Sequence, residues 1–538
     1  MRLDRVYIDG FKNLKEAECR FDEAHLTTVI IGQNGAGKSN LIEAIVEVFR
    51  SVDLNRGAPR FRYEVEYQLY KARIILSNMT GKPTMTCNGK KLSRKEFDAN
   101  KEAYFPDLVF GYYSGASRRL EQLFDSHQRR YYDAIKLNEN SYECQEARVA
   151  RRLFYCRPIH GIFALLSCFA YPTPSVLKLL KEKLGVTAFN SALVIFREPW
   201  YAKSTKRIPK KRQGRFNENP NMARALWGAK GPAGQCARAI RDLAFHPIAV
   251  KDKPIDDYRD KGGEEEQLGA FIRTLGALKT LAKEYKNDAE FFAALEATDI
   301  SDLVRDLHLW VNRTNDETGD VSFSDLSDGE RQLLMVMGLI RISRGKRALF
   351  LLDEPDTHLN PHWQHSYLDL IQEWTEVAST ESKCHIIMTS HNPLTIAALK
   401  KEEVRVMVSD ENTAKVTIGP PYTDPRGMGF TATLTEIFGL PTSLDPETQR
   451  AVDERNTLAQ IAQRSADQQR QLIAINDKLN RLGFMFEDRE PLYNEFLQSW
   501  KDVRYADRPP LTPAQIEARR NAMSTLIKDL IADKGGAA

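Results

Sequence analysis

The sequence predicts an α/β protein in which a mixed sheet is flanked by helices, interrupted by an α+β insertion and followed by a helical tail. Three observations predict this class: a strand, glycine loop and helix near the N-terminus, a buried strand that ends in two acids at 353–354, and a third apolar strand that ends at His391. Short apolar runs bounded by polar loops are typical of parallel strands buried on both faces. At 538 residues and 42% hydrophobic composition, the chain can bury a large core in about two or three domains.

Composition narrows the class of protein. The longest strongly apolar stretch, Ile162 to Tyr171, is far shorter than the ~20 residues that cross a bilayer, and the N-terminus MRLDRVYIDG lacks the apolar centre of a signal peptide. The seven cysteines include no C-x-x-C pair, so neither a zinc site nor a disulfide framework is predicted. We therefore expect a cytoplasmic protein without a membrane partner.

The N-terminal segment carries a phosphate loop. LTTVIIG is a buried strand rich in β-branched residues, LIEAIVEVF has helical spacing, and GQNGAGKS between them matches G-x-x-x-x-G-K-[ST]. Glycines let the backbone wrap a phosphate, Lys38 can reach the β- and γ-phosphates, and the Ser39 hydroxyl is suited to hold Mg²⁺. The expected nucleotide contacts are Gly32, Gln33, Asn34, Gly35, Ala36, Gly37, Lys38, Ser39 and Asn40.

A second nucleotide signal is the strand ALFLLDE. Its apolar run delivers Asp353 and Glu354 to the carboxyl edge of a parallel sheet, where ligands bind. Asp353 is placed to hold Mg²⁺ through its water shell, and Glu354 points toward a water that attacks the γ-phosphate. HIIMTSHNP then gives a buried strand ending at His391, where a γ-phosphate sensor is expected. Taken alone, each strand end could also be a solvated polar turn.

The stretch LSDGERQ, residues 326–332, opens an amphipathic helix and is called the signature segment below. Ser327 and Gly329 at its tip favour phosphate binding, because backbone N–H groups and the helix dipole both point at an anion. The chain already has a phosphate loop with a more complete motif, GQNGAGKS. The tip at Ser327 and Gly329 is therefore expected to contact a different phosphate.

The order of phosphate loop, signature segment, acid-terminated strand and TSH resembles the heads of ABC-type ATPases of the RecF and SMC branch. In that family the signature serine and glycine close over the γ-phosphate of a partner subunit. The resemblance implies ATP and Mg²⁺ as ligands and a homodimer through shared ATP sites, with higher oligomers also compatible. It makes Ser327 and Gly329 the signature contacts, Asp353 the Mg²⁺-associated acid, Glu354 the general base and His391 the switch histidine.

The same resemblance implies that Thr357 to Asn360 cross toward the partner site and that Lys12 lies near the nucleotide. Two departures from the family pattern are present. Asp328 and Glu330 add negative charge beside the phosphate, so we expect slow hydrolysis. No glutamine-bearing Q-loop is found, because LVFGYYSG offers Tyr113 and Ser114 at that strand end.

The segment HLNPHWQH offers an alternative metal site. His358, His362 and His365 have spacing suited to a zinc-binding helical face. The position of the segment directly after the acidic strand favours a role in the subunit interface instead.

The motifs divide the chain into four parts. Residues 1–50 form the N-terminal part of the head, 51–320 an insertion and lobe, 321–440 the C-terminal part of the head, and 441–538 a helical tail for assembly or partner docking. Within the insertion, residues 203–215 carry seven lysines and arginines and no acid. Such a run is either a solvated surface or a contact to nucleic-acid phosphates.

The tail pattern predicts one long helix. Asp445 and Pro446 make a cap and first turn, and the chain can remain helical to Leu482, with Gly483 as its stop. Its three-four spacing predicts a seam facing one partner helix, formed by Leu458, Ile461, Ser465, Gln468, Leu472, Ile475, Leu479 and Leu482. The tail either pairs with a final helix from Thr512 or docks another subunit, and we favour assembly.

A narrower resemblance covers most of the chain. The head with its short insertion, WGAKG, the EIFGLPTSLDPETQ junction and the helical tail resemble PtuA, the family of ATPase subunits of Septu anti-phage systems, including retron-associated versions. This implies an HNH nuclease partner and, in retron versions, a reverse transcriptase with its msDNA. Neither an H-N-H pattern nor the acidic clusters of a TOPRIM domain occur, so no intrinsic nuclease site is expected. The alternative is a RecF-like DNA-repair ATPase that loads other factors.

Overall fold

The computed structural model describes residues 1–22, 24–136, 140–201, 222–253, 264–343, 346–378, 384–410, 415–440, 442, 444–461 and 464–482. The chain divides into two compact units, Met1–Pro441 and Thr442–Ala538. The basic segment 203–215, Gly483 and the expected final helix from Thr512 lie outside the described residues.

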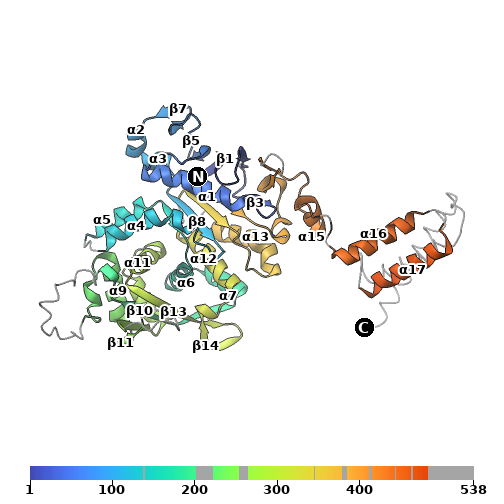
Figure 1. Ribbon diagram of the computed structural model, residues 1–538. Helices are drawn as coiled ribbons and strands as arrows, with labels where there is room; N and C mark the ends of the chain where they lie inside the picture. The colour runs from blue at the N-terminus through green and yellow to red at the C-terminus, as the bar shows by residue number, and fades with distance from the viewer. Residues whose placement is uncertain are drawn as a thin grey trace. The chain divides into compact units, whose positions relative to one another are not determined.

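A 13-stranded mixed sheet forms the centre of the first unit (Figure 1). Its strands from β17 to β9 are parallel neighbours, and most of the remaining pairs are antiparallel. In spatial order the strands are β7 (Lys90–Leu92), β6 (Thr84–Cys87), β5 (Ala72–Ser77), β4 (Arg62–Leu69), β1 (Arg2–Asp9), β2 (Ala17–Arg20), β18 (Val416–Gly419), β17 (Val404–Ser409), β3 (Thr27–Gly32), β16 (His385–Thr389), β15 (Ala348–Asp353), β8 (Leu108–Tyr113) and β9 (Leu153–Tyr155).

Alternating residues of the parallel strands face two separate cores. On β15, Leu349 and Leu351 join the core that also contains the apolar face of α1 (Lys38–Leu54), while Phe350 and Leu352 join the core with α6 (Ile159–Ala170) and α12 (Asp328–Ile342). Every residue of β3, β15 and β16 is buried. The expected mixed sheet flanked by helices is confirmed.

The head sheet extends into the range expected to be an insertion. Strands β4 to β9, between Arg62 and Tyr155, belong to the same sheet as β3. The expected boundary at residue 50 therefore does not coincide with an edge of the sheet. The helices in this range are α2 (Arg94–Ala99), α3 (Lys101–Tyr104), η1 (Glu121–Leu123), α4 (Asp125–Ile135) and α5 (Ser141–Ala150).

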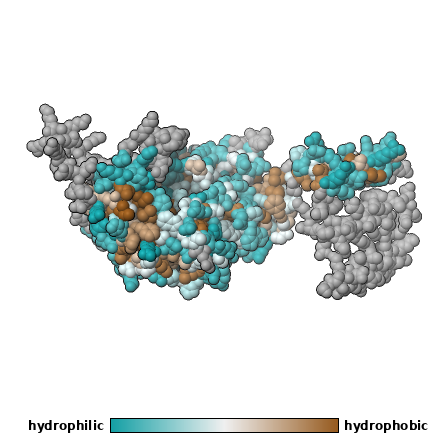
Figure 2. All heavy atoms as spheres, turned by 90° about the horizontal axis from the view of Figure 1, so that it is seen from below, coloured by the Kyte–Doolittle hydropathy of each residue, from teal (hydrophilic) through white to brown (hydrophobic). Residues whose placement is uncertain are grey.

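A five-stranded antiparallel sheet lies in the same unit and appears in the lower part of Figure 1. Its order is β11 (Ile248–Asp252), β12 (Glu265–Ile272), β10 (Val186–Arg197), β13 (Val304–Arg313) and β14 (Asp316–Ser322). Every residue of the edge strand β11 is exposed, including Ile248 and Val250. Brown, hydrophobic areas are visible on the face shown in Figure 2.

The other helices of this unit complete the layers. Those near the five-stranded sheet are α7 (Pro174–Leu184), η3 (Leu226–Gly228), α9 (Gly231–Leu243), α10 (Leu275–Ala282), α11 (Asp288–Ile300) and η4 (Phe323–Asp325). Those that follow β15 are α13 (Pro361–Ala378), α14 (Pro393–Ile396), η5 (Lys401–Glu403), α15 (Gly429–Ala432) and η6 (Thr433–Ile437). In the part of the chain that the structure describes, no helix combines the length and apolar character needed to cross a bilayer.

The expectation of one continuous tail helix is wrong. The second unit contains two helices, α16 (Pro446–Gln460) and α17 (Ala466–Arg481), which pack on each other. Ser465 accepts the N–H of Gln468, and the Gln468 side chain accepts the N–H of Ser465, a capping box that starts a new helix. The two polar seam positions are therefore a helix start, and the hairpin is closed by ion pairing of Lys478 with Glu447 at 2.6 Å.

Candidate nucleotide-binding site

The phosphate loop connects β3 to α1. A Cβ on Gly32 would lie 2.3 Å from the Met407 carbonyl oxygen of neighbouring β17, so the strand pairing itself requires glycine there. Gly37 precedes α1 with φ of 103°, and no side chain caps the helix. The first-turn N–H groups of α1 are therefore suited to an anion, as a phosphate loop requires.

The loop is held by its own lysine and by a neighbouring asparagine. Lys38 Nζ donates to the carbonyl oxygens of Gly32 and Gln33 at 2.7 and 3.2 Å. Asn13 donates to the Gly35 carbonyl oxygen at 2.8 Å and accepts from Asn40 at 2.7 Å. Of the remaining loop residues, Gln33, Asn34 and Gly35 are exposed and Ala36 is buried.

The two expected Mg²⁺ ligands lie side by side. Ser39 Oγ donates to Asp353 Oδ1 at 2.9 Å, and Thr389 Oγ1 donates to the same oxygen at 2.6 Å. A hydroxyl and a carboxylate are the hard oxygen donors that Mg²⁺ prefers, so these residues fit that ion. Burial raises the pKa of the Asp353 carboxyl, and the hydrogen bonds from Thr389 and Ser39 oppose that rise.

Glu354 follows in a left-handed conformation with φ of 54°, which is unusual for a residue other than glycine. Its N–H donates to Thr389 Oγ1 at 3.0 Å, and its carboxylate lies 3.4 Å from His391 Nδ1. The His391 hydrogen bond holds the pKa of Glu354 below its ordinary value, and the same contact raises the pKa of His391. Glu354 is therefore ionised and oriented by the histidine.

Sequence reasoning missed an arginine in this site. Arg119 Nη2 lies 3.3 Å from Asp353 Oδ2, and its Nε lies 3.3 Å from Oε1 of Glu43 on α1. Lys12, expected near the nucleotide, pairs with Glu43, the same acid that Arg119 contacts. Arg119 comes from an irregular segment after β8, so no periodic pattern singles it out.

The signature segment is partly exposed. Ser327 caps α12 and is exposed, as is Asp328, whereas Leu326 and Gly329 are buried within the chain. A Cβ on Gly329 would lie 2.6 Å from the His358 carbonyl oxygen, so the loop after β15 packs directly on this glycine. Within the described residues, Ser327 has no hydrogen bond to the phosphate loop.

The loop expected to cross to a partner leaves its polar residues on the surface. Thr357 donates to the Glu354 carbonyl oxygen at 3.0 Å, and Asn360 caps α13 by accepting the Trp363 N–H at 2.9 Å. The residues of the zinc alternative are each exposed: His358, His362 and His365. Within the described residues, no three metal-ligating side chains come together.

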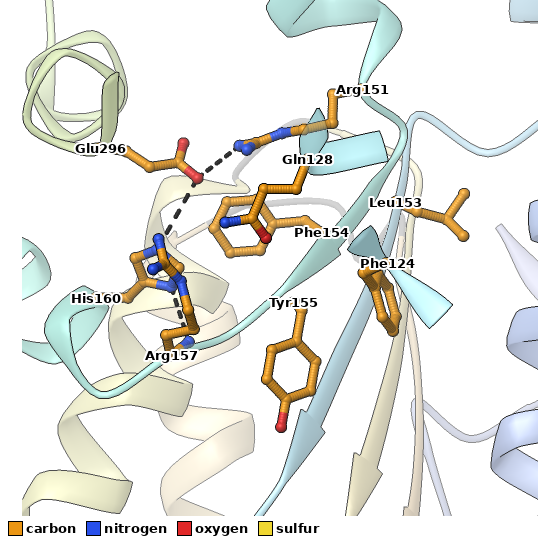
Figure 3. A pocket seen from close by; sticks show the side chains of 9 residues that line it. All are labelled: Phe124, Gln128, Arg151, Leu153, Phe154, Tyr155, Arg157, His160 and Glu296. Carbon is orange, nitrogen blue, oxygen red and sulfur yellow. Dashed lines mark hydrogen bonds and ion pairs between the residues drawn. The ribbon is translucent and has the colours of Figure 1, made fainter. Parts of the chain in front are cut away.

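A buried polar cluster lies apart from these motifs (Figure 3). Arg151 donates to Glu296 at 2.6 Å, and His160 accepts the Arg157 N–H at Nδ1 while its Nε2 lies 3.9 Å from the Glu296 carboxylate. The enclosed space is about 10 Å³, room for no more than one water. This cluster ties α11 to the segment between α5 and α6 and has no space for a nucleotide.

Two protein-family models match the chain. Residues 1–109, which include the phosphate loop, match a family described as "AAA ATPase domain". Residues 188–397, which include the signature segment, Asp353 and His391, match "AAA domain, putative AbiEii toxin, Type IV TA system". Both matched regions are therefore those of an AAA-type ATPase domain. In this ATPase the first matched region supplies the phosphate loop, and the second supplies Asp353, Glu354 and His391.

Curated relatives of the ATPase come from two protein groups. It is 26% identical over 156 residues to the DNA replication and repair protein RecF of Phocaeicola vulgatus, which covers 25% of this chain and 41% of that protein. It is also 26% identical over 166 residues to the Septu protein PtuA of Bacillus mycoides, covering 29% of this chain and 22% of that protein. The ATPase thus matches less than half the length of either relative.

Solved structures similar to the ATPase include an SMC head domain from Thermotoga maritima, at 14% identity and a TM-score of 0.32, covering 79% of this chain and 100% of that one. RecF with ATP is another, at 15% identity and a TM-score of 0.25, covering 73% and 92%.

Proposed function

We propose that this ATPase is an ATP-binding and ATP-hydrolysing regulatory subunit of an anti-phage defence complex, and that it controls a separate HNH nuclease of the PtuB kind. The observation that carries the ATP site is the hydrogen bond of Ser39 to Asp353, which joins the phosphate loop and the acid-terminated strand in one place. The 26% identity to a Septu PtuA supports the defence role.

In the proposed reaction, water attacks the γ-phosphate of ATP, and ADP and phosphate leave. Residues 32–40 bind the triphosphate, and Lys38 offsets its negative charge. Glu354, ionised and held by His391, accepts a proton from the attacking water. Mg²⁺, held by Ser39 and Asp353, would neutralise phosphate charge when bound.

The proposed active form is a homodimer in which each signature segment completes the site of the other chain. The exposed side chain of Ser327 at the tip of α12 supports this, because it lies at the surface where a phosphate from outside can reach it. The acidic neighbours Asp328 and Glu330 oppose phosphate approach, which is why we expect slow turnover. Further association of dimers is compatible with this arrangement.

A matched pair of substitutions tests the shared site. In a Glu354→Gln background, which should retain ATP, Ser327→Asp keeps a capping side chain but repels a phosphate, whereas Ser327→Asn keeps the cap without charge. We expect ATP to produce a dimer by light scattering with Ser327→Asn and a monomer with Ser327→Asp, while both variants bind ATP. Equal masses in ATP would refute the shared-site dimer.

Co-expression with the neighbouring reading frames tests the defence role. The proposal expects an HNH nuclease to co-purify with the ATPase, and in a retron setting a reverse transcriptase with its msDNA. Removal of residues 442–538 should then release the nuclease while ATP binding remains, because those residues form a separate compact unit. If the nuclease still co-purifies after this deletion, the tail does not form the interface with the nuclease.

A RecF-like repair ATPase is the second candidate, supported by the 26% identity to RecF. The basic residues 203–215 would serve either role by contacting nucleic-acid phosphates. Tight binding to gapped duplex DNA by the purified chain, with no nuclease among its neighbours, would favour this candidate.

A further inference from the structure

Two carboxylates of the candidate ATP site share one arginine. Asp353 ends β15 and is 1% exposed, and Glu43 lies on α1 and is 4% exposed. Arg119 reaches Asp353 Oδ2 with Nη2 and Glu43 Oε1 with Nε, at 3.3 Å in each case. A positive charge thus lies on the acid that is expected to associate with Mg²⁺.

The partners of Asp353 leave no oxygen free. Oδ1 accepts from Ser39 and Thr389, and Oδ2 faces Arg119. A guanidinium on Oδ2 and a divalent cation associated with the same carboxylate repel each other at this separation. Buried carboxylates also require a compensating charge, and Arg119 supplies one to both Asp353 and Glu43.

The Arg119 side chain is placed so that it can move away from Asp353 into solvent. Its side chain is 39% exposed, so solvent can accept the charge when the contact breaks. The guanidinium lies 5.0 Å from the ring centre of Tyr113, the last residue of β8, which pairs with Asp353 in the sheet. The next residue, Ser114, donates its N–H to the Asp353 carbonyl oxygen at 3.2 Å. The Arg119 segment therefore begins at the metal site and leads directly into η1 and α4.

We propose that Arg119 is a displaceable internal cation: it neutralises Asp353 and Glu43 in the nucleotide-free chain and gives way when Mg²⁺ and ATP bind. It is a positioning residue, and the inference rests on the proposed ATP site.

The full-length chain provides the test. Arg119→Gln removes the charge and retains a polar side chain. Its neighbour Arg118, which pairs with Glu121 and is 62% exposed, gives the matched control Arg118→Gln. ATP affinity is measured by calorimetry with Mg²⁺ and with EDTA, and melting temperature is measured for the nucleotide-free proteins with and without millimolar Mg²⁺ alone.

We expect Arg119→Gln to lower the Mg²⁺ concentration needed for half-maximal ATP binding by about fivefold or more, since competing sites are commonly coupled to this degree. Mg²⁺ alone should raise the melting temperature of Arg119→Gln and leave that of the wild type and of Arg118→Gln unchanged. Arg119→Lys should behave like the wild type, which covers the case in which the glutamine variant fails to fold.

An unchanged Mg²⁺ requirement in Arg119→Gln would overturn the inference. So would a loss of ATP affinity that is equal with Mg²⁺ and with EDTA, because Arg119 would then contact the nucleotide itself. Failure of the wild type to bind ATP under both conditions would instead refute the proposed function.

Discussion

Glu330 holds Ser327 at the tip of α12: its carboxylate accepts the Ser327 N–H at 2.8 Å and the Ser327 hydroxyl at 3.0 Å. The other carboxylate oxygen of Glu330 pairs with Arg313, the last residue of β13. One acid therefore connects the five-stranded sheet to the serine that is expected to contact a phosphate. The signature segment is positioned by the lobe as well as by its own helix.

Substitution of Arg313 should weaken this connection. Arg313→Gln leaves the largely buried Glu330 without its ion pair, so we expect the free energy of unfolding to fall by about 1–3 kcal/mol. Arg331→Gln is the matched control, because Arg331 pairs with exposed Asp328 on the same helix turn and such pairs contribute about 0–1 kcal/mol. Thermal unfolding of the nucleotide-free chain measures both, and equal losses would contradict the prediction.

Loss of Lys38 should remove most nucleotide affinity. Lys38→Ala deletes the charged donor at the phosphate loop, and hydrogen bonds to charged groups contribute about 1.5–3 kcal/mol, so ATP binding should weaken by roughly 10- to 150-fold. Exposed Lys15, which lies nearby in the sequence, serves as the control, and Lys15→Ala should leave affinity unchanged. Calorimetric titration measures the difference; unaltered affinity in Lys38→Ala would refute the role of the loop.

Stability should fall on acidification because of His385. Burial lowers the pKa of this histidine to about 3, and it accepts the Leu3 N–H at 3.1 Å in the neutral form. Between pH 6.5 and 3 the unfolded chain therefore binds the extra proton, so the contribution of His385 is intact above pH 6.5 and lost as pH falls. The loss reaches about 2 kcal/mol at pH 5.

His385→Asn retains an acceptor for Leu3 and should reduce the drop in melting temperature between pH 7 and pH 5. Exposed His246, which has no ion pair among the described residues, supplies the comparison, and His246→Asn should leave that drop unaltered. If both variants lose as much stability on acidification as the wild type, another group is responsible.

Substitution of Ser465 should change hydrogen exchange in opposite directions in a tail hairpin and in one continuous tail helix. In the hairpin, Ser465 caps α17, so Ser465→Ala should cost about 1 kcal/mol and speed hydrogen exchange in the first turn of α17, and Ser465→Asp should restore protection. In one continuous helix, alanine would be the better helix former and exchange would slow. Slower exchange in Ser465→Ala would therefore show that the tail is continuous.

Short local patterns made parts of the site predictable. The phosphate loop and Asp353 are marked by contiguous motifs with strand flanks, and the structure brings Ser39 and Asp353 together. Arg119 could not be found in this way, because it lies in an irregular segment and its partner Asp353 is 234 residues away in the chain. Long-range charge pairing leaves no mark in local spacing.

The tail shows the opposite error. Ser465 and Gln468 fit a three-four seam, and the periodic pattern continued across them. The same two residues form a capping box, S-x-x-Q, which is a signal for a helix start. Where a seam position is serine followed three residues later by glutamine, the local capping hydrogen bonds outweigh the helical period. The sequence predicted a mixed sheet in the head, but it did not show that the strands of residues 62–155 belong to that sheet. Sequence spacing does not identify which strands pair.

The place of β3 in the sheet has a consequence for synthesis of the chain. This strand ends at Gly32, yet both of its neighbours, β16 and β17, begin at His385 and Val404. At about 5–20 residues per second, a ribosome needs roughly 20–70 s to supply them. Throughout that interval both edges of the nascent TTVIIG segment lack their partner strands, and unpaired apolar strands are prone to aggregate. The growing polypeptide therefore depends on chaperones until β17 has been translated.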